Sequence, residues 1–242
     1  MKYYTQLLSH VLEYQIMRLA VLFSGGKDSV HAAYTMVQMG HQLTTLVSIV
    51  PSDDHSWVFH TPNLEFLPTM ANAMGLPLVT EASTGEEKSD LKALYKALRG
   101  LDIDGVVMGA IASDYQWDRI NQVCEELGLK TFSPLWRKDQ SILMEDIVMS
   151  GIRSLLVRVS CEGMDDSWLG REINGHTLEN MATLSNKYRF NLSGEGGEYE
   201  TLVLDSPLHN QSLCISDLKK DISRDEGNLI IGKMILEGKN GS

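Results

Sequence analysis

The chain has 242 residues, of which 43% are hydrophobic and 22% charged, and this ordinary composition excludes a disordered, collagen-like or coiled-coil protein. Its 21 basic and 32 acidic residues give a net charge of -11, which argues against broad nucleic-acid binding because an acidic surface repels a phosphate backbone. The sequence holds no apolar run long enough for a membrane-spanning helix. Its three cysteines are far apart and lack metal-site spacing, so we expect a reduced, cytoplasmic protein.

From Met17 onward, short apolar runs alternate with amphipathic segments of helical length. Continuous apolar strands with helices between them indicate a parallel sheet covered on both faces, which is an α/β fold. Thr61 is the expected N-cap of the second helix. In chain order the pattern predicts strand Leu19–Phe23, helix Asp28–Met39, strand Leu43–Val50, helix Pro62–Met74, strand Leu78–Glu81, helix Glu86–Leu98, strand Gly105–Ile111, helix Asp114–Leu127, strand Thr131–Leu135 and helix Ser141–Ser150.

The alternation becomes less regular after Arg137. Further on, the pattern predicts strand Leu155–Val159, helix Leu178–Tyr188 and strands Thr201–Leu204, Cys214–Ile215 and Leu229–Ile231. We therefore expect a first α/β domain over 17–137 and a smaller α/β domain over 138–242. Residues 1–16 are interpreted as an N-terminal extension ahead of an alternative start at Met17.

The most informative segment is Ser24-Gly25-Gly26-Lys27-Asp28-Ser29, between the first predicted strand and the first predicted helix. Its glycines permit a sharp turn and a close backbone approach, and the helix N-terminus that follows favours an anion. The serine hydroxyls and the lysine suit phosphate, while Asp28 suits Mg²⁺ held on that phosphate. The alternative is a tight strand-to-helix turn in which Asp28 or Ser29 only caps the helix.

This loop resembles the pyrophosphate loop of the N-type ATP pyrophosphatases, whose domain is a five-stranded parallel sheet of the adenine-nucleotide α-hydrolase-like (HUP) class. The resemblance implies that ATP is split between its α and β phosphates, that an oxygen of the substrate is adenylated, and that a nucleophile displaces AMP. The motif alone leaves the substrate open.

Four further segments narrow the substrate. They are Phe59–Asn63 (FHTPN), Gly109–Gln116 (GAIASDYQ), Glu162–Gly170 (EGMDDSWLG) and Gly194–Thr201 (GEGGEYET). From about Met17 to Glu237 the chain closely resembles the diphthine–ammonia ligases, or diphthamide synthetases, in their short archaeal form. The resemblance implies ATP- and Mg²⁺-dependent amidation of the carboxylate of diphthine with ammonium, through an acyl-adenylate. Diphthine is a modified histidine of translation elongation factor 2 that carries a trimethylammonium group.

Parallel α/β sheets bind ligands outside the carboxyl ends of their strands, so the loops after the first, second and fourth strands should meet there. With the resemblance, this placement implies the following ATP-binding residues: Ser24, Gly25, Gly26, Lys27, Asp28, Ser29, His60, Gly109, Ala110, Ile111 and Arg119. Two of these assignments have alternatives. Arg119 could instead form a surface salt bridge, and His60 could merely support the helix that Thr61 caps.

The resemblance also implies a second set of residues around the substrate. These are Asp114, Trp168, Glu195, Gly196, Gly197, Glu198, Tyr199, Glu200 and Thr201. Their carboxylates would face the trimethylammonium group or ammonium, and Tyr199 or Trp168 would add a cation–π face. Lys27, Asp28 and Glu198 are the expected catalytic residues, with Asp28 as the metal ligand. The alternative for Gly194–Thr201 is a solvated turn that enters a strand.

Three other functions remain open from the sequence. The first is a tRNA-modifying ATP pyrophosphatase, which the acidic charge and the cysteine spacing disfavour. The second is a nucleotide-binding sensor like the universal stress proteins, and the third is amidation of another carboxylate. We expect elongation factor 2 and ammonium as partners, and neither a membrane nor a nucleic acid. A homodimer is among the oligomeric states left open.

Overall fold

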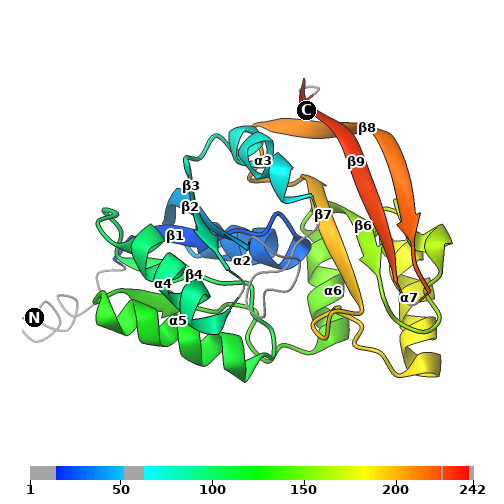
Figure 1. Ribbon diagram of the computed structural model, residues 1–242, viewed down its shortest axis with the longest axis horizontal. Coiled ribbons are helices and arrows are strands. Elements are labelled where there is room, and N and C mark those ends of the chain that lie inside the picture. The colour runs from blue at the N-terminus through cyan, green and yellow to red at the C-terminus, as the bar shows by residue number, and fades with distance from the viewer. Residues whose placement is uncertain (1–14, 52–62, 85, 225, 240–242) are drawn as a thin grey trace, which may run out of the picture.

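The computed structural model describes residues 15–51, 63–84, 86–224 and 226–239 (Figure 1). Its N-terminal sheet has five parallel strands in the order β3-β2-β1-β4-β5. The predicted five-stranded parallel sheet is therefore confirmed. The strands are β1 (Arg18–Leu22), β2 (Gln42–Pro51), β3 (Leu78–Ser83), β4 (Gly105–Val107) and β5 (Lys130–Phe132).

Helices cover both faces of this sheet, because side chains alternate along each strand. On β1, Leu19 and Val21 pack into one core cluster with residues of α2 and α3, whereas Ala20 and Leu22 pack into another with residues of α4 and α5. The helices that follow the strands are α2 (Lys27–Gln38), α3 (Leu67–Met74), α4 (Glu87–Leu98), α5 (Asp114–Glu126) and α6 (Gln140–Met149).

The predicted start of the helix Pro62–Met74 was wrong. A 3₁₀ turn, η1 (Leu64–Phe66), precedes α3, which begins only at Leu67 and carries Pro68 in its first turn. Proline suits that place because the first turn needs no amide hydrogen from it. Asn63 has a left-handed backbone (φ 64°) that interrupts a helix, and the expected cap Thr61 lies outside the described residues.

A second, antiparallel sheet follows in the order β7-β6-β9-β8. Its elements are β6 (Arg153–Val159), η2 (Asp166–Trp168), α7 (Gly175–Tyr188), β7 (Tyr199–Asp205), β8 (Gln211–Ile222) and β9 (Gly227–Gly238). We call these elements, with the segments that join them, the C-terminal unit. The smaller α/β part is present, but β8 and β9 form a hairpin of two 12-residue strands, far longer than the sequence pattern predicts.

One core cluster spans both sheets. It contains Val21 of β1, Met70 of α3, Leu156 of β6, Val203 of β7 and Ile231 of β9. Figure 1 shows β7 and β6 beside the N-terminal sheet, while β8 and β9 extend over α3. The two sheets are thus fixed against each other by shared apolar burial rather than joined by a linker alone.

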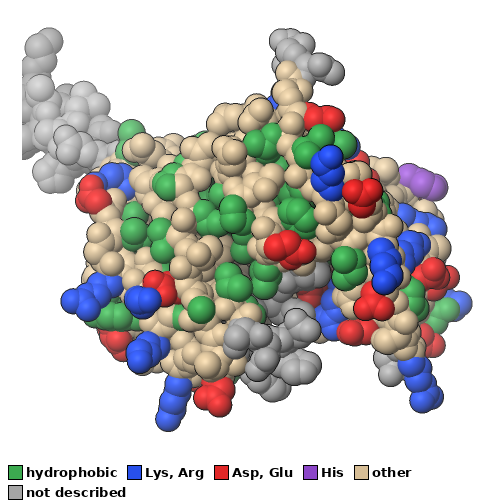
Figure 2. Space-filling view, turned by 45° about the horizontal axis from the view of Figure 1, so that its top comes forward, with side chains coloured by type: hydrophobic (Ala, Val, Ile, Leu, Met, Phe, Trp, Pro, Cys, Tyr) green, Lys and Arg blue, Asp and Glu red, His purple; other side chains and the backbone are tan. Residues whose placement is uncertain are grey.

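The surface carries mixed charge. On the face shown in Figure 2, basic and acidic side chains are interspersed, with hydrophobic side chains between them. Across the described ranges, no helix is both long enough and apolar enough to cross a membrane.

Candidate active site

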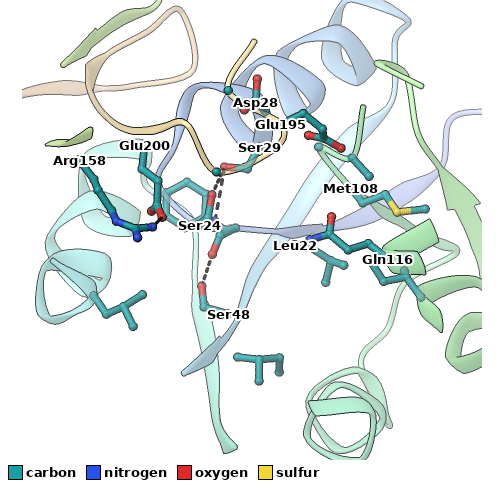
Figure 3. Close-up of a pocket in the computed structure, with 18 residues that line it drawn as sticks. Leu22, Ser24, Asp28, Ser29, Ser48, Met108, Gln116, Arg158, Glu195 and Glu200 are labelled. Carbon is teal, nitrogen blue, oxygen red and sulfur yellow. Dashed lines mark hydrogen bonds and ion pairs between the residues drawn. The ribbon is translucent and has the colours of Figure 1, made fainter. Parts of the chain in front are cut away.

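A cavity of about 340 Å³ opens at the carboxyl ends of β1, β2 and β4 (Figure 3). This volume suits a small-molecule ligand. The N-terminal sheet contributes one wall, which includes Leu22, Phe23, Ser24, Ser48, Met108 and Gly109. The C-terminal unit contributes the other wall, with Arg158, Gly194, Glu195, Gly197 and Glu200. The cavity therefore requires both parts of the chain.

The glycine-rich loop after β1 contributes hydroxyl groups to the cavity. Ser24 Oγ lies 3.2 Å from Ser29 Oγ and accepts a hydrogen bond from the Gly26 amide, also at 3.2 Å. Gly26 is the N-cap of α2 without a side-chain hydrogen bond, so the alternative in which Asp28 or Ser29 caps the helix is not seen. Gly25 has φ +76°, which favours glycine. The loop presents a helix N-terminus and two serines, an arrangement that suits an anion.

Gly109 permits close packing of β4 against this loop. A Cβ atom there would lie 2.8 Å from the backbone carbon of Asp28 and from the Ser29 nitrogen. Such an approach requires a residue without a side chain. The predicted segment Gly109–Ile111 is thus at the cavity, although Ala110 lines it and Ile111 is buried behind it.

Lys27 points away from the position expected for phosphate. Its side chain is 3% exposed, and Nζ donates to the Ser193 carbonyl at 2.6 Å and pairs with Asp28 at 2.8 Å. The ammonium also lies 5.1 Å from the centre of the Tyr199 ring. The Lys27 amide donates to Thr201 Oγ1 at 3.0 Å. Both ends of Lys27 therefore hold the loop against the C-terminal unit.

Asp28 lines the cavity, and one of its carboxylate oxygens fits a metal ion. Oδ2 pairs with Lys27, whereas Oδ1 is buried and has no hydrogen-bond partner among the described residues. No cluster of three metal-ligating side chains occurs in the part of the chain that the structure describes. Mg²⁺ needs no such cluster, since proteins often hold it by one carboxylate together with substrate phosphates. Asp28 therefore fits a metal that arrives with a nucleotide.

Glu195 connects the two walls. Its Oε1 accepts hydrogen bonds from three successive backbone amides, those of Ile111 (3.1 Å), Ala112 (2.8 Å) and Ser113 (3.1 Å). Ser113 is the N-cap of α5, where a negative charge is favourable. Glu195 thus holds the loop after β4 in place as well as lining the cavity.

Two charged residues of α5 form ion pairs with neighbouring side chains. Arg119 Nε pairs with Glu87 at 2.8 Å, and its guanidinium stacks 3.7 Å from the centre of the Tyr115 ring. Arg119 therefore forms a salt bridge, which was the alternative to a phosphate contact. Hydrogen bonds from Tyr115 and then Arg119 lower the pKa of Glu87. Asp114 pairs with Arg137 at 3.1 Å on the exposed surface. Neither Arg119 nor Asp114 lines the cavity.

The two aromatic candidates do not offer a ring face to the cavity. Tyr199 is 2% exposed, its hydroxyl donates to the Leu192 carbonyl at 2.6 Å, and burial raises the pKa of that hydroxyl well above its usual value. Trp168 is 7% exposed and packs in the core, with Arg171 4.7 Å above its ring. Their predicted cation–π role is not supported, because each ring already faces a cation of the chain.

The acidic segment Gly194–Thr201 separates into different roles. Glu198 accepts hydrogen bonds from the Asn191 and Gly196 amides, both at 2.8 Å, and so shapes its own loop without lining the cavity. Gly197 lines the cavity, and Thr201 Oγ1 accepts a hydrogen bond from the Lys27 amide. Glu200 lines the cavity beside Arg158. The turn-and-strand alternative is also correct, since β7 begins at Tyr199.

Several residues that line the cavity were not among those expected from the sequence. Of the expected residues, His60 lies outside the described part of the chain. Ser48 donates to the Phe23 carbonyl at 2.5 Å, and Met108 and Gln116 line the opposite end from Arg158 (Figure 3). Gln116 ends the segment Gly109–Gln116 that the sequence singled out, and Arg158 had a signal of its own as the charged residue inside the apolar run LLVRV. A charge that interrupts a buried strand often marks a site.

A five-stranded parallel sheet with a glycine-rich phosphate-type loop after β1 defines an α/β protein of the adenine-nucleotide α-hydrolase-like class. The diphthamide synthase N-terminal domain family matches residues 17–131, and the diphthamide synthase C-terminal domain family matches residues 139–236. The chain belongs to the diphthamide synthase family, which places it among the ATP-dependent ligases.

Curated relatives named diphthine–ammonia ligase agree with this assignment. A Danio rerio relative is 34% identical over 238 residues, covering 89% of this chain and 93% of its own. The Homo sapiens relative is 33% identical over 226 residues, covering 82% of this chain and 83% of its own. A Schizosaccharomyces pombe relative is 34% identical, but the match covers only 36% of its length.

A solved structure from Methanocaldococcus jannaschii is also similar. Titled as a predicted subunit of tRNA methyltransferase, it matches 79% of this chain and 100% of its own with a TM-score of 0.41 and 13% identity.

Proposed function

We propose that the chain amidates the carboxylate of diphthine on translation elongation factor 2, in the cytoplasm, with ATP and ammonium. ATP would bind the domain over 17–137, and the domain over 138–242 would present the substrate. The observation that carries the proposal is the shared cavity: the glycine-rich loop and Asp28 face Glu200 and Arg158 of the C-terminal unit across it. Relatives that this chain covers almost completely carry the name of this activity.

The nucleotide fits the N-terminal wall of the cavity. Leu22, Met108 and Gly109 offer an apolar surface for adenosine, and Ser24 and Ser29 offer hydroxyls to the phosphates. Mg²⁺ bound by Asp28 would neutralise charge on the departing pyrophosphate. Because the transfer of an adenylyl group depends mainly on position and charge, this arrangement can supply the activation without a covalent enzyme intermediate.

The reaction would proceed in two displacements. A carboxylate is a poor electrophile, so its oxygen first attacks the α-phosphorus of ATP, pyrophosphate leaves, and an acyl-adenylate forms. Ammonium loses a proton to give ammonia, whose nitrogen attacks the acyl carbon; AMP leaves with the shared oxygen, and a second proton is released. Asp28, Glu195 and Glu200 make the cavity acidic, which favours a cation such as ammonium near the site.

The test follows both products of ATP. The protein is incubated with ATP, Mg²⁺ and ammonium, with and without diphthine-bearing elongation factor 2. AMP and pyrophosphate that form only with the factor, together with replacement of its hydroxyl by an amino group in the mass spectrum, are the expected result. AMP formation that ignores the factor but responds to tRNA or to a small carboxylate would overturn the proposal, as would ATP binding without pyrophosphate release.

A matched pair of variants ties the activity to the cavity. Asp28→Asn should lower the rate of pyrophosphate release at least about a hundredfold, since it removes the carboxylate proposed for Mg²⁺. Asp102→Asn is the control, because that carboxylate is 87% exposed and pairs with Arg18 at the opposite end of β1. Equal rates in the two variants would contradict the assigned role of Asp28.

A further inference from the structure

A partly buried group of three charges occupies one end of the cavity. Arg158 lies on β6 directly opposite Glu200 of β7, and its other neighbouring strand is β9. The guanidinium bonds Glu200 at 3.1 Å and Glu226 at 2.6 Å. The Arg158 and Glu200 side chains are 18% and 16% exposed, and both line the cavity. Burial lowers the pKa of Arg158, but its bonds to the two carboxylates outweigh this effect, so it stays charged.

The position of this group separates it from the nucleotide wall. In Figure 3, Arg158 and Glu200 lie on one side of Ser24 and Ser29, whereas Met108 and Gln116 lie on the other. A ligand at the Arg158 end would therefore meet the phosphates from the side opposite to adenosine. That end of the cavity therefore remains for a second ligand that reaches the phosphates.

The opposite charges of the pair select the kind of ligand. Arg158 and Glu200 present a cation and an anion side by side to the cavity. A plain carboxylate would bind Arg158 only in competition with Glu200, because both are anions. A ligand that carries a carboxylate and a cation side by side avoids this competition, because each of its charges meets the opposite charge of the pair.

We propose that Arg158 and Glu200 form a bipolar subsite for a betaine group, with the ligand carboxylate beside the guanidinium and its quaternary ammonium beside Glu200. The inference rests on the proposed function, since diphthine carries its trimethylammonium on the carbon next to the carboxylate that is amidated. Arg158 then orients the reacting carboxylate toward the phosphates. Glu200 selects substrates that carry the cation and excludes simple carboxylates.

Small probes test the subsite without the protein substrate. Binding of glycine betaine to the wild-type chain is compared by ligand-observed NMR with binding of 3,3-dimethylbutanoate, which has the same shape and carboxylate but no cation. We expect betaine to bind at least about tenfold more tightly, as for a ligand with one additional partly buried charge pair. Equal binding of the two probes by the wild type would overturn the proposal. Because this comparison uses only the wild-type protein, it does not depend on whether a variant folds.

Variants then assign the preference to residues. Glu200→Gln should remove the preference for betaine. Arg158→Gln should weaken the binding of both probes, whereas Arg158→Lys should keep part of that binding. The control is Arg153→Gln, on the same strand, because Arg153 pairs with Glu172 on the surface at 3.0 Å and does not line the cavity. A preference for betaine that survives in Glu200→Gln would overturn the role of Glu200.

Kinetics separate this inference from the proposed function. In Glu200→Gln, the KM for diphthine-bearing elongation factor should rise roughly tenfold, while the KM for ATP changes less than about twofold. Amidation by the wild type with an unchanged KM in Glu200→Gln would overturn the subsite and leave the proposed function standing. A wild type that prefers betaine but does not amidate the factor would support the subsite and contradict the proposed function.

Discussion

At the scale of single residues, Glu195 has a large structural effect for one side chain, because three backbone amides of the loop after β4 donate to it. Replacing it with alanine leaves these three amides, two of them part-buried, without their acceptor. We expect Glu195→Ala to lower the free energy of unfolding by about 2 kcal/mol in urea denaturation, the cost of losing a charged acceptor at a helix start. Glu172→Ala is the control, since that residue forms a surface ion pair. Equal losses in the two variants would contradict this account.

His209 makes the stability depend on pH. It is 5% exposed, its Nδ1 lies 2.6 Å from Ser206 Oγ, and its Nε2 has no hydrogen-bond partner within the described residues. Burial lowers its pKa from the usual 6.5 to about 4, while the nearby charge of Asp205 raises the pKa and that of Lys239 lowers it. The folded state therefore keeps the ring neutral where the unfolded chain takes up a proton.

The sign of the effect follows from this difference. Stability is full above about pH 6.5 and falls as the pH drops toward 4, by roughly 3 kcal/mol for this group. His31, whose pKa burial also lowers, acts in the same direction. His209→Gln should flatten the urea-unfolding profile over this range, whereas His176→Gln, at an exposed position of α7, should not. A profile that stays as steep in His209→Gln would contradict the assignment.

The same scale shows what the sequence could and could not tell. The glycine-rich loop and Gly109 lie at the cavity as expected, because each follows a strand of the parallel sheet and the carboxyl ends of those strands meet at one edge. The acidic segment also reaches the cavity, but it follows α7 and leads into β7 of the antiparallel sheet, so that reasoning does not explain its place. The direction of each side chain was not predictable. Tyr199 and Glu200 are neighbours in sequence, yet alternation along β7 buries the first and directs the second to the cavity. That alternation depends on where the strand pairs.

At the scale of elements, hydrogen bonds connect the start of α2, and the loop before it, to β7 and the segment that precedes β7. Lys27 donates to the Ser193 carbonyl and to Thr201 through its two ends, and the Val203 amide donates to the Gly25 carbonyl at 2.9 Å. These bonds fix the glycine-rich loop before any ligand binds. A preorganised loop loses less conformational entropy on binding phosphate.

Substitution of Lys27 separates this structural role from direct phosphate binding. Lys27→Met leaves the Asp28 carboxylate without its buried partner, so we expect the free energy of unfolding to fall by about 3 kcal/mol. Lys96→Met, which breaks the exposed pair with Glu81, should cost less than about 1 kcal/mol. Urea denaturation measures both losses. A Lys27→Met protein of wild-type stability that binds ATP weakly would instead show that Lys27 acts on phosphate.

Element boundaries were predictable to different degrees. The strands and helices of the parallel sheet have strong apolar runs and were predicted within a few residues, apart from the start of α3. The long β8–β9 hairpin was seen only as two short pieces, because much of β8 is exposed and carries polar residues such as Lys219, Lys220 and Asp221. Backbone hydrogen bonds between β8 and β9 extend these strands, and the hydrophobic pattern of the sequence does not reveal that pairing.

At the scale of the whole molecule, the shared core predicts how the protein unfolds. Val21, Met70, Leu156, Val203 and Ile231 belong to one cluster, so separating the two sheets would expose apolar surface on both. The two hydrogen bonds between the Asn63 side-chain amide and the β9 backbone, both at 3.1 Å, and the bond from the Asn210 amide to the Ala73 carbonyl, at 2.7 Å, would break at the same time. Partial unfolding of either sheet alone is therefore costly.

We accordingly expect one cooperative transition. In calorimetry the measured enthalpy should equal the van't Hoff enthalpy, and far-ultraviolet circular dichroism should coincide with tryptophan fluorescence, since the tryptophans include Trp136 against the core of the N-terminal sheet and Trp168 in the C-terminal unit. ATP with Mg²⁺ should raise the midpoint of that single transition, because the ligand binds a cavity whose walls come from both sheets. If ATP instead shifted only an early transition of the N-terminal sheet, with a second transition unmoved, the walls would be independent. Glu200 and Arg158 could then be presented to the nucleotide only after the two parts had docked.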